Sequence, residues 1–301
     1  MITHFIGIGP PKTGTTWIFK NLKSHPKLFL PSFKESHFWT KEKVGSKEVE
    51  NYKSCFSEVS EEKLVGEIST DYFHSSVAAK NINRYHPDVL LFTVLRNPID
   101  QIQSHYWHLQ RQQFHQWTRE GTPNTLEEAL HDRRIRELLV EPALYAKHLA
   151  RWLSYFDRDQ LLILFFEDMK QDSQGFLRQI FNHIGVEPSF QKNKLDLDGS
   201  TVRGGTSPRS DVHERVRAFL YEKLVRKVYH PLKKKIGVYS AKKLKEMLRV
   251  REILDWLFRK KGYPEMKPAT KNHLKTKLHD DVRSLEELTG RDLSHWIPPR
   301  D

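Results

Sequence analysis

A short segment near the start of the chain combines a buried strand, a turn and a helix. The apolar run Phe5–Ile8 predicts a strand, Gly9–Thr16 predicts a loop, and Trp17–Lys23 has apolar residues at helical spacing. The first backbone N–H groups of a helix have no partner inside it and point at any ligand in front of them. Gly14 lets the backbone approach such a ligand closely. The segment therefore predicts an α/β fold with an anion-binding loop at its first strand–helix junction.

The loop differs from the phosphate loop of nucleoside triphosphatases at one decisive position. That loop has the pattern G-x-x-x-x-G-K-[ST], and this chain has Gly9-Pro-Pro-Lys-Thr-Gly-Thr-Thr16. Thr15 stands where the lysine belongs, and the lysine lies earlier, at Lys12. A nucleoside triphosphatase needs its lysine on the terminal phosphates and its Ser or Thr on magnesium. The pattern thus predicts a phosphate loop of another type, with an ordinary glycine-containing turn as the alternative.

The string Pro-Lys-Thr-Gly-Thr-Thr-Trp resembles the 5′-phosphosulfate loop of sulfotransferases that use 3′-phosphoadenosine 5′-phosphosulfate (PAPS). The resemblance implies that Lys12 and the N–H groups of the loop hold the 5′-phosphosulfate, and that Lys12 stabilises charge on the leaving phosphate. It also implies that the ring of Trp17 stacks on adenine. The cofactor-binding residues implied in this segment are Pro11, Lys12, Thr13, Gly14, Thr15, Thr16 and Trp17.

A second anion-binding pair follows the clearest strand of the chain. Val89–Leu95 contains seven apolar or β-branched residues without alternation, which is typical of a central strand in a parallel sheet. Arg96 follows it, Pro98 starts a helix, and Ser104 lies one to two turns into that helix. Taken singly, Arg96 equally predicts a strand-end ion pair and Ser104 a helix-face hydroxyl. The pair resembles the 3′-phosphate motif of the same family, an Arg followed eight residues later by a Ser.

Glu35 follows a short predicted strand, Leu28–Leu30, and lies between a lysine and His37. This position predicts a positioned base or a solvated turn. The segment Glu-Ser-His-Phe-Trp resembles that of heparan-type and bacterial sulfotransferases, which implies that Glu35 is the catalytic base. His37 is then expected to orient Glu35 or to touch the sulfonate. The alternative bases are Glu67, Asp71, His37, His105 and His108.

The residues at the end of a third predicted strand, Leu64–Ile68, depart from the family pattern. Relatives have a lysine or histidine there that takes part in transfer, whereas this chain has Ile68 and Thr70. A histidine-base mechanism is therefore not expected at that place, and a second catalytic lysine there is in doubt. A late segment containing Arg203 and Gly204 weakly resembles the loop that closes over the nucleotide; a surface turn explains it equally well.

Strands that alternate with amphipathic helices predict a P-loop-like doubly wound parallel sheet flanked by helices. The remaining expected elements are helices over 99–111, 144–156 and 174–184 and a strand over 160–166. The length of 301 residues suits a single domain over 1–301, with a basic helical insertion at about 205–270. Residues 203–283 contain 23 lysines and arginines against nine acidic residues. This basic segment predicts either a solvated helical face or contact with an acidic partner or carrier, an anionic acceptor or a membrane surface.

The composition suits a protein that binds an anionic ligand but does not identify that ligand. The net charge of +12 suits PAPS, which is strongly anionic, but it also suits nucleic acid or a sulfated sugar. Cys55 is the only cysteine, which excludes an intrachain disulfide and fits a reducing compartment. No apolar run approaches the ~20 residues that span a bilayer, and the start of the chain leaves no room for a signal peptide. A cytoplasmic protein without an integral membrane segment is therefore expected.

The patterns and the resemblance together predict a PAPS-dependent sulfotransferase. It would move a sulfuryl group to the hydroxyl of a small molecule, natural product or carbohydrate and release 3′-phosphoadenosine 5′-phosphate (PAP). No metal is expected, because His108 and His115 lack partners at metal-ligand spacing. The rivals are a P-loop kinase or NTPase and a non-enzymatic nucleotide-binding or nucleic-acid-binding protein. Thr15 argues against the first, and the lack of aromatic platforms and of zinc or helix-turn-helix signatures argues against nucleic acid.

Overall fold

The computed structural model describes most of the chain in two compact units. The described residues are 3–56, 59, 63–111, 123, 125–188, 206–210, 212–213, 216, 219–220, 223, 253 and 256–298. The first unit comprises residues 1–105, 133–203 and 267–301, and the second comprises 106–132 and 204–266. The second unit thus includes most of the segment in which the sequence places a basic helical insertion, up to residue 266.

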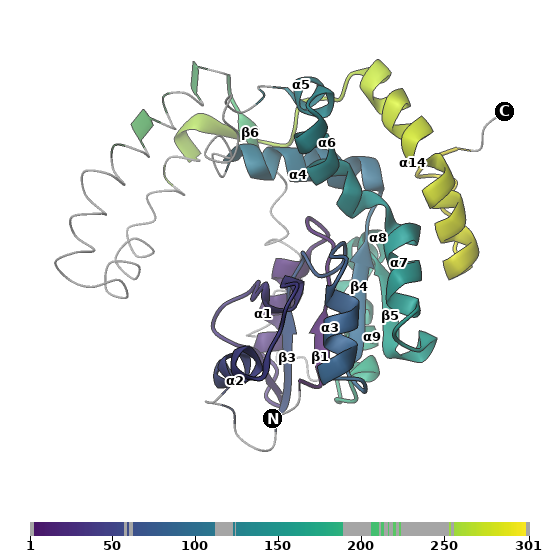
Figure 1. The fold of residues 1–301 in the computed structure, drawn as a ribbon. Coiled ribbons are helices and arrows are strands. Elements are labelled where there is room, and N and C mark those ends of the chain that lie inside the picture. Colours follow the sequence, from purple (N-terminus) through teal and green to yellow (C-terminus); the bar gives the residue numbers. More distant parts are fainter. Residues whose placement is uncertain are drawn as a thin grey trace. The chain divides into compact units, whose positions relative to one another are not determined.

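The first unit is built on a five-stranded sheet in which every neighbouring pair is parallel. Its strands are β1 (Phe5–Gly7), β2 (Leu28–Phe29), β3 (Leu64–Ile68), β4 (Leu90–Leu95) and β5 (Leu161–Phe165). They lie in the order β2-β3-β1-β4-β5 (Figure 1). Ile6 of the central strand lies in register with Glu67 on one side and Leu91 on the other. The predicted parallel sheet is confirmed, and all five strands occur where the apolar runs place them.

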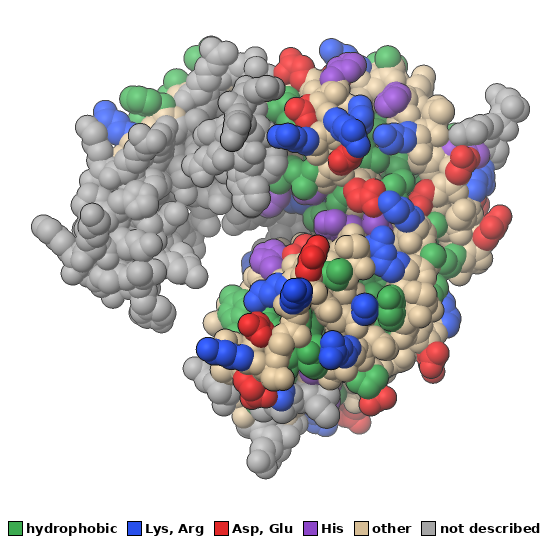
Figure 2. All heavy atoms as spheres, viewed as in Figure 1, with side chains coloured by type: hydrophobic (Ala, Val, Ile, Leu, Met, Phe, Trp, Pro, Cys, Tyr) green, Lys and Arg blue, Asp and Glu red, His purple; other side chains and the backbone are tan. Residues whose placement is uncertain are grey.

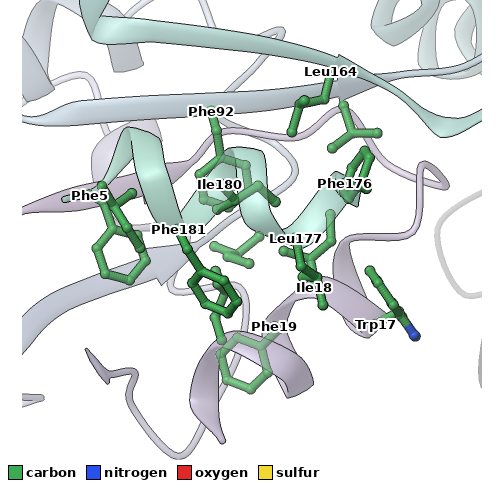
Figure 3. Close-up of a cluster of buried hydrophobic side chains, with 14 of the residues drawn as sticks. Phe5, Trp17, Ile18, Phe19, Phe92, Leu164, Phe176, Leu177, Ile180 and Phe181 are labelled. Carbon is green, nitrogen blue, oxygen red and sulfur yellow. The ribbon is translucent and has the colours of Figure 1, made fainter. Parts of the chain in front are cut away.

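One face of the sheet is covered by α1 (Thr15–Lys23) and α9 (Ser173–His183). Figure 3 shows their apolar side chains meeting those of the strands in one cluster. Burial of side chains of this size contributes roughly 1.5–3 kcal/mol each to folding, so the cluster anchors the helix that follows the anion loop. The members labelled in the figure are Phe5, Trp17, Ile18, Phe19, Phe92, Leu164, Phe176, Leu177, Ile180 and Phe181.

The opposite face follows from the handedness of the connections. The connection from β1 to β2 runs one way along the sheet, while those from β3 to β4 and from β4 to β5 run the other way. Because crossovers are right-handed, connections in opposite directions place their helices on opposite faces. The helices α3 (Ala78–Tyr85) and α7 (Tyr145–Leu153) therefore share the second face. The Asn83 amide donates to the carbonyl of Tyr155 at 2.7 Å, which ties α3 to the residues after α7.

A long late helix, α14 (Pro268–Thr289), packs against α7. Its Asp281 carboxylate accepts hydrogen bonds from the backbone N–H groups of Ala146 (3.1 Å) and Lys147 (3.0 Å). These groups belong to the first turn of α7, where N–H groups lack partners within the helix. Asp281 thus caps α7 from a segment more than a hundred residues away in sequence.

The other helices of the described residues are shorter than α14. They are α2 (Ser46–Ser54), α4 (Pro98–Arg111), α5 (Leu126–His131), α6 (Arg133–Val140) and α8 (Phe166–Gln171), with 3₁₀ turns η1 (Phe38–Thr40), η3 (Glu141–Ala143) and η4 (Arg158–Gln160). In the second unit, β6 (Thr206–Pro208) pairs antiparallel with β7 (Arg259–Lys261). Over the first unit, Figure 2 shows Lys and Arg side chains interspersed with Asp and Glu.

Candidate active site

The predicted site residues meet at one edge of the sheet. Because all five strands are parallel, the segments that follow them emerge at the same edge. The loop 8–14 follows β1, Thr70 and Asp71 follow β3, and Arg96 follows β4. The chain leaves β1 and β4 in opposite directions, so their carboxyl ends form the switch point of the sheet, where ligands bind in open α/β folds.

Four consecutive carbonyl groups of the loop accept hydrogen bonds from side chains. The bonds run from Thr93 Oγ1 to Gly9 O, from Thr13 Oγ1 to Pro10 O (2.9 Å), from Gln101 Nε2 to Pro11 O (3.1 Å) and from Arg96 Nη1 to Lys12 O (3.5 Å). The loop is therefore held by its carbonyl oxygens; three of the donors come from β4 and the residues after it, and the fourth is Thr13 of the loop itself.

These bonds also decide where the N–H groups of the loop point. In a trans peptide unit the N–H points away from the C=O of the same unit, and the cis peptide in the loop is Gly9–Pro10. The N–H groups of Lys12 and Thr13 are thus directed away from Gln101 and Arg96. Positive φ at Lys12 (70°) and Gly14 (87°), on either side of Thr13, is typical of nests in which successive N–H groups face one anion.

Gly14 is the N-cap residue of α1, and its conformation explains why a glycine stands there. Its φ of 87° is left-handed, and a Cβ at this position would lie 2.7 Å from Cε of the buried Met169. The N–H groups of Trp17 and Ile18 both donate to the Gly14 carbonyl, so the helix ladder starts there. The N–H groups of Thr15 and Thr16 precede that ladder and extend the row of loop donors.

Glu35 is held by the segment that follows β3. Its backbone N–H donates to the Ile68 carbonyl (3.1 Å), and its φ is 65°. Its Oε2 accepts from the N–H (2.6 Å) and the hydroxyl (3.0 Å) of Thr70, and Lys34 pairs with Oε1. A carboxylate has about four lone-pair positions, so the three contacts leave one on Oε1. Thr70 stands at a position where relatives have a lysine or histidine. Here its N–H and hydroxyl groups fix the orientation of the Glu35 carboxylate, the expected base.

His37 is oriented by a different carboxylate from the one expected. Its Nδ1 lies 2.5 Å from Oδ2 of Asp71, and its backbone N–H donates to the Ser69 hydroxyl (3.3 Å). The imidazole is 60% exposed, so its other nitrogen is open to an approaching molecule. The expectation that His37 orients Glu35 is wrong, because Asp71 holds the ring while Thr70 and Lys34 hold Glu35. A contact between His37 and the sulfonate stays a prediction.

Lys34 belongs to the same cluster, although sequence reasoning did not select it. Its side chain is 15% exposed and pairs with Glu35. Burial lowers the pKa of Lys34 from 10.5 to about 8; Asp71 opposes this shift and the charge of Lys12 adds to it. The only sequence signal was its place beside Glu35, since a lysine in a polar turn is normally exposed.

Two of the alternative bases, Glu67 and His105, are buried, and burial disfavours a role as catalytic base. Glu67 is 2% exposed and accepts hydrogen bonds from Tyr52 (2.6 Å) and Tyr72 (3.0 Å), whose hydroxyl is 2.6 Å from that of Ser36. Burial raises the pKa of Glu67, and the hydroxyl donors oppose the rise. Glu67 is thus connected through Tyr72 to Ser36, the residue that follows Glu35.

His105 is also disfavoured as a base, although it is near the loop. It is 8% exposed, and burial, with a smaller effect of the Lys12 charge, lowers its pKa to about 3. A base with so low a pKa has little driving force to take a proton at neutral pH. His108 lies in the second unit. Among the described residues, no group of three or more His, Cys, Asp and Glu side chains could hold a metal ion.

The structure places Arg96 at the loop and Ser104 in the interior. The Arg96 guanidinium is over the ring of Phe166 at 4.8 Å and lies 3.6 Å from Asp100, besides its contact with the Lys12 carbonyl. Its side chain is 18% exposed. Ser104, on α4, is 4% exposed. The joint binding of one phosphate by these two residues stays a prediction.

Burial contradicts the role expected for the Trp17 ring. The side chain is 2% exposed and packs edge-to-face on Phe176, at 6.4 Å between centroids, within the cluster of Figure 3. The sequence does not tell whether Trp17 lies on the ligand side of the first helix or on its core side. The tertiary packing shows that its indole is part of the core. Arg203, Gly204 and His115 lie outside the described residues.

Comparison with known proteins identifies the family. The family model described as the sulfotransferase domain matches residues 3–201, which include β1 to β5 and every described residue of the site. The chain belongs to the sulfotransferase domain family.

The chain is similar to two curated sulfotransferases in sequence and to one solved sulfotransferase in fold. Over 207 residues, the chain is 30% identical to the mouse bifunctional heparan sulfate N-deacetylase/N-sulfotransferase 4, covering 63% of this chain and 23% of that protein. It is 23% identical to human carbohydrate sulfotransferase 15 over 302 residues, covering 80% and 54%. The chain thus spans a quarter to about half of these relatives. A crystal structure of a sulfotransferase from Alicyclobacillus acidocaldarius matches with a TM-score of 0.66 and 22% identity, covering 98% of this chain and 99% of that one.

In the part of the sulfotransferase chain that the structure describes, no helix is long and apolar enough to cross a membrane.

Proposed function

We propose that this chain transfers a sulfuryl group from PAPS to an acceptor hydroxyl and releases PAP. One observation carries the proposal. The loop is held by its carbonyl oxygens at the same edge of the sheet at which the Glu35 carboxylate is held with one lone pair uncommitted. Transfer between two oxygens needs donors for the negative charge and a base for the acceptor, held in fixed positions.

The residues present fit the nucleotide. The N–H groups from Lys12 to Thr16 and the Lys12 ammonium would hold the 5′-phosphosulfate, since N–H groups at a helix start bind phosphate and sulfate. Arg96, with Ser104, would hold the 3′-phosphate. When bound, PAPS supplies an activated sulfuryl group. Lys12 would stabilise the charge that develops on the phosphate side.

Glu35 is the proposed base. The Thr70 N–H and hydroxyl fix Oε2 and leave the remaining lone pair on Oε1, so the acceptor proton would move to Oε1. A positioned base typically contributes about 10²–10⁴-fold to a rate. The ring of His37, held by Asp71 and open to solvent, lies beside the acceptor route in this proposal and is its second-choice base.

The acceptor is proposed to be a hydroxyl of a small molecule, natural product or carbohydrate. The name of the mouse relative identifies an N-sulfotransferase and that of the human relative a carbohydrate sulfotransferase. An acceptor screen should therefore include amino sugars as well as hydroxyl compounds. A cytoplasmic location and an acidic partner for the basic segment also stay predictions.

The test combines nucleotide binding with turnover. Lys12→Ala is expected to lower turnover by orders of magnitude while the fold persists, and Lys20→Ala, which removes an exposed lysine of α1, should leave it unchanged. Glu35→Gln should lose about 10²–10⁴-fold in single-turnover transfer yet bind PAP nearly as well as the unmodified chain. Tight magnesium-dependent ATP binding with weak PAP binding would favour a kinase instead.

A further inference from the structure

Lys34 is a largely buried cation whose charge the proposed reaction does not yet use. Its side chain is 15% exposed, and lysines are almost never buried unless they are paired. It follows β2 by a few residues and reaches the same edge as the loop. Its partner Glu35 accepts one of the three hydrogen bonds that its ammonium group can donate.

The charges around Lys34 come from three segments. Glu35 is its neighbour in the chain, Asp71 follows β3 and also holds His37, and Lys12 lies in the loop after β1. Asp71 favours the charged ammonium, whereas burial and Lys12 disfavour it. Two lysines within electrostatic reach of each other repel, and an anion that contacts both removes that repulsion.

We propose that Lys34 is a second cation of the anion site and, together with Lys12, binds the phosphate or sulfate oxygens of the nucleotide. The inference rests on the proposed function. In this proposal, an anion held by the loop N–H groups contacts Lys12 on the side of the leaving phosphate and Lys34 on the side of Glu35.

Anion binding at Lys34 has a consequence for protons. With a pKa of about 8, Lys34 is about half neutral at pH 8. An anion that contacts the amine favours its charged form, so the neutral amine takes one proton from solvent as the nucleotide binds. Phosphate groups are already ionised at pH 8 and take up none. Binding of PAP should therefore be accompanied by uptake of up to about half a proton at pH 8.

Isothermal titration calorimetry in two buffers of different ionisation enthalpy measures this uptake directly on the unmodified chain. Lys34→Met should weaken PAP binding roughly 10–100-fold and abolish the uptake. Lys34→Arg should keep most of the affinity and also abolish the uptake, because a guanidinium stays protonated. Lys27→Met, which removes an exposed lysine just before β2, should change neither quantity.

The outcomes separate this inference from the function on which it rests. If the unmodified chain fails to bind PAP, the proposed function and the inference are both overturned. If PAP binds without proton uptake at pH 8, or if uptake persists in Lys34→Arg, only the role of Lys34 is overturned. The unmodified chain alone gives the first two results, so a Lys34→Met protein that does not fold leaves the test intact.

Discussion

Replacing Gly14 by alanine tests whether the start of α1 is a built part of the anion site. Two costs are expected. A left-handed conformation costs a non-glycine residue about 1–2 kcal/mol. The new Cβ would also lie 2.7 Å from Cε of Met169 and 3.3 Å from the ring of Phe166, and overpacking of this kind costs about 1–3 kcal/mol. Because the Met169 side chain can yield, we expect the free energy of unfolding to fall by about 2–4 kcal/mol.

Gly185 provides a matched control. Its φ is +77°, close to the +87° of Gly14, but a Cβ there would meet nothing within 4 Å. Gly185→Ala should therefore show the conformational cost alone, about 1–2 kcal/mol, and the difference between the two variants measures the steric part. Urea denaturation followed by circular dichroism gives both values.

The same variants separate stability from binding. Gly14→Ala should also weaken PAP binding, since the N–H groups that follow residue 14 shift with its Cβ, whereas Gly185→Ala should leave binding unchanged. Met169→Ala removes the side chain that the new Cβ would contact. The double variant Gly14→Ala/Met169→Ala should therefore lose less stability than the sum of the two single variants, by about the steric part of the Gly14→Ala cost. Equal costs for the two glycine variants, or unchanged PAP affinity in Gly14→Ala, would refute the reasoning.

Three further predictions concern the second anion contact, acid stability and a helix cap. Arg96→Ala and Ser104→Ala should each weaken PAPS by about 1.5–3 kcal/mol more than adenosine 5′-phosphosulfate, which lacks the 3′-phosphate. Burial lowers the pKa of His86 and of His148 to about 4, below the unfolded value of 6.5. Both histidines are neutral in the folded chain at pH values where they are already protonated in the unfolded chain. The free energy of unfolding therefore does not depend on them above pH 6.5 and falls as pH falls towards 4, by about 1.4 kcal/mol for each histidine at pH 5.5. Asp281→Ala should cost about 0.5–2 kcal/mol, because two N–H groups of α7 lose their acceptor.

Each of these has a direct check. Calorimetry with both nucleotides tests the 3′-phosphate contact, and equal weakening of the two would make Arg96 and Ser104 structural residues. Urea unfolding at pH 7.5 and 5.5 should show a smaller pH effect in His86→Gln than in the unmodified chain; an identical effect would mean that His86 keeps its proton in the fold. A melting temperature unchanged by Asp281→Ala would show that the cap contributes nothing.

The glycine-containing loop and the apolar runs were enough to predict the parallel sheet, the family and the edge where the site lies. Such features are local: a run of buried residues predicts a strand wherever it packs, and parallel strands necessarily bring the segments that follow them to one edge. The positions of Lys12, Glu35 and Arg96 relative to their strands could therefore be predicted from the chain alone.

The partners of these residues depend on contacts between segments far apart in the chain. Thr70 binds Glu35 across 35 positions, and Asp71 rather than Glu35 holds His37. The spacing of residues within one segment carries no information about the register of another, so neither pairing was predictable from sequence.

Burial decided the remaining differences. Trp17 lies in the core because α9 packs against it, and Lys34 is only 15% exposed although a lysine in a polar turn is normally exposed; only the tertiary structure decides both. The sequence by itself thus determined which chemical groups reach the edge of the sheet. The tertiary structure decided which of them are paired, buried or open to a ligand, since those properties arise from packing between elements.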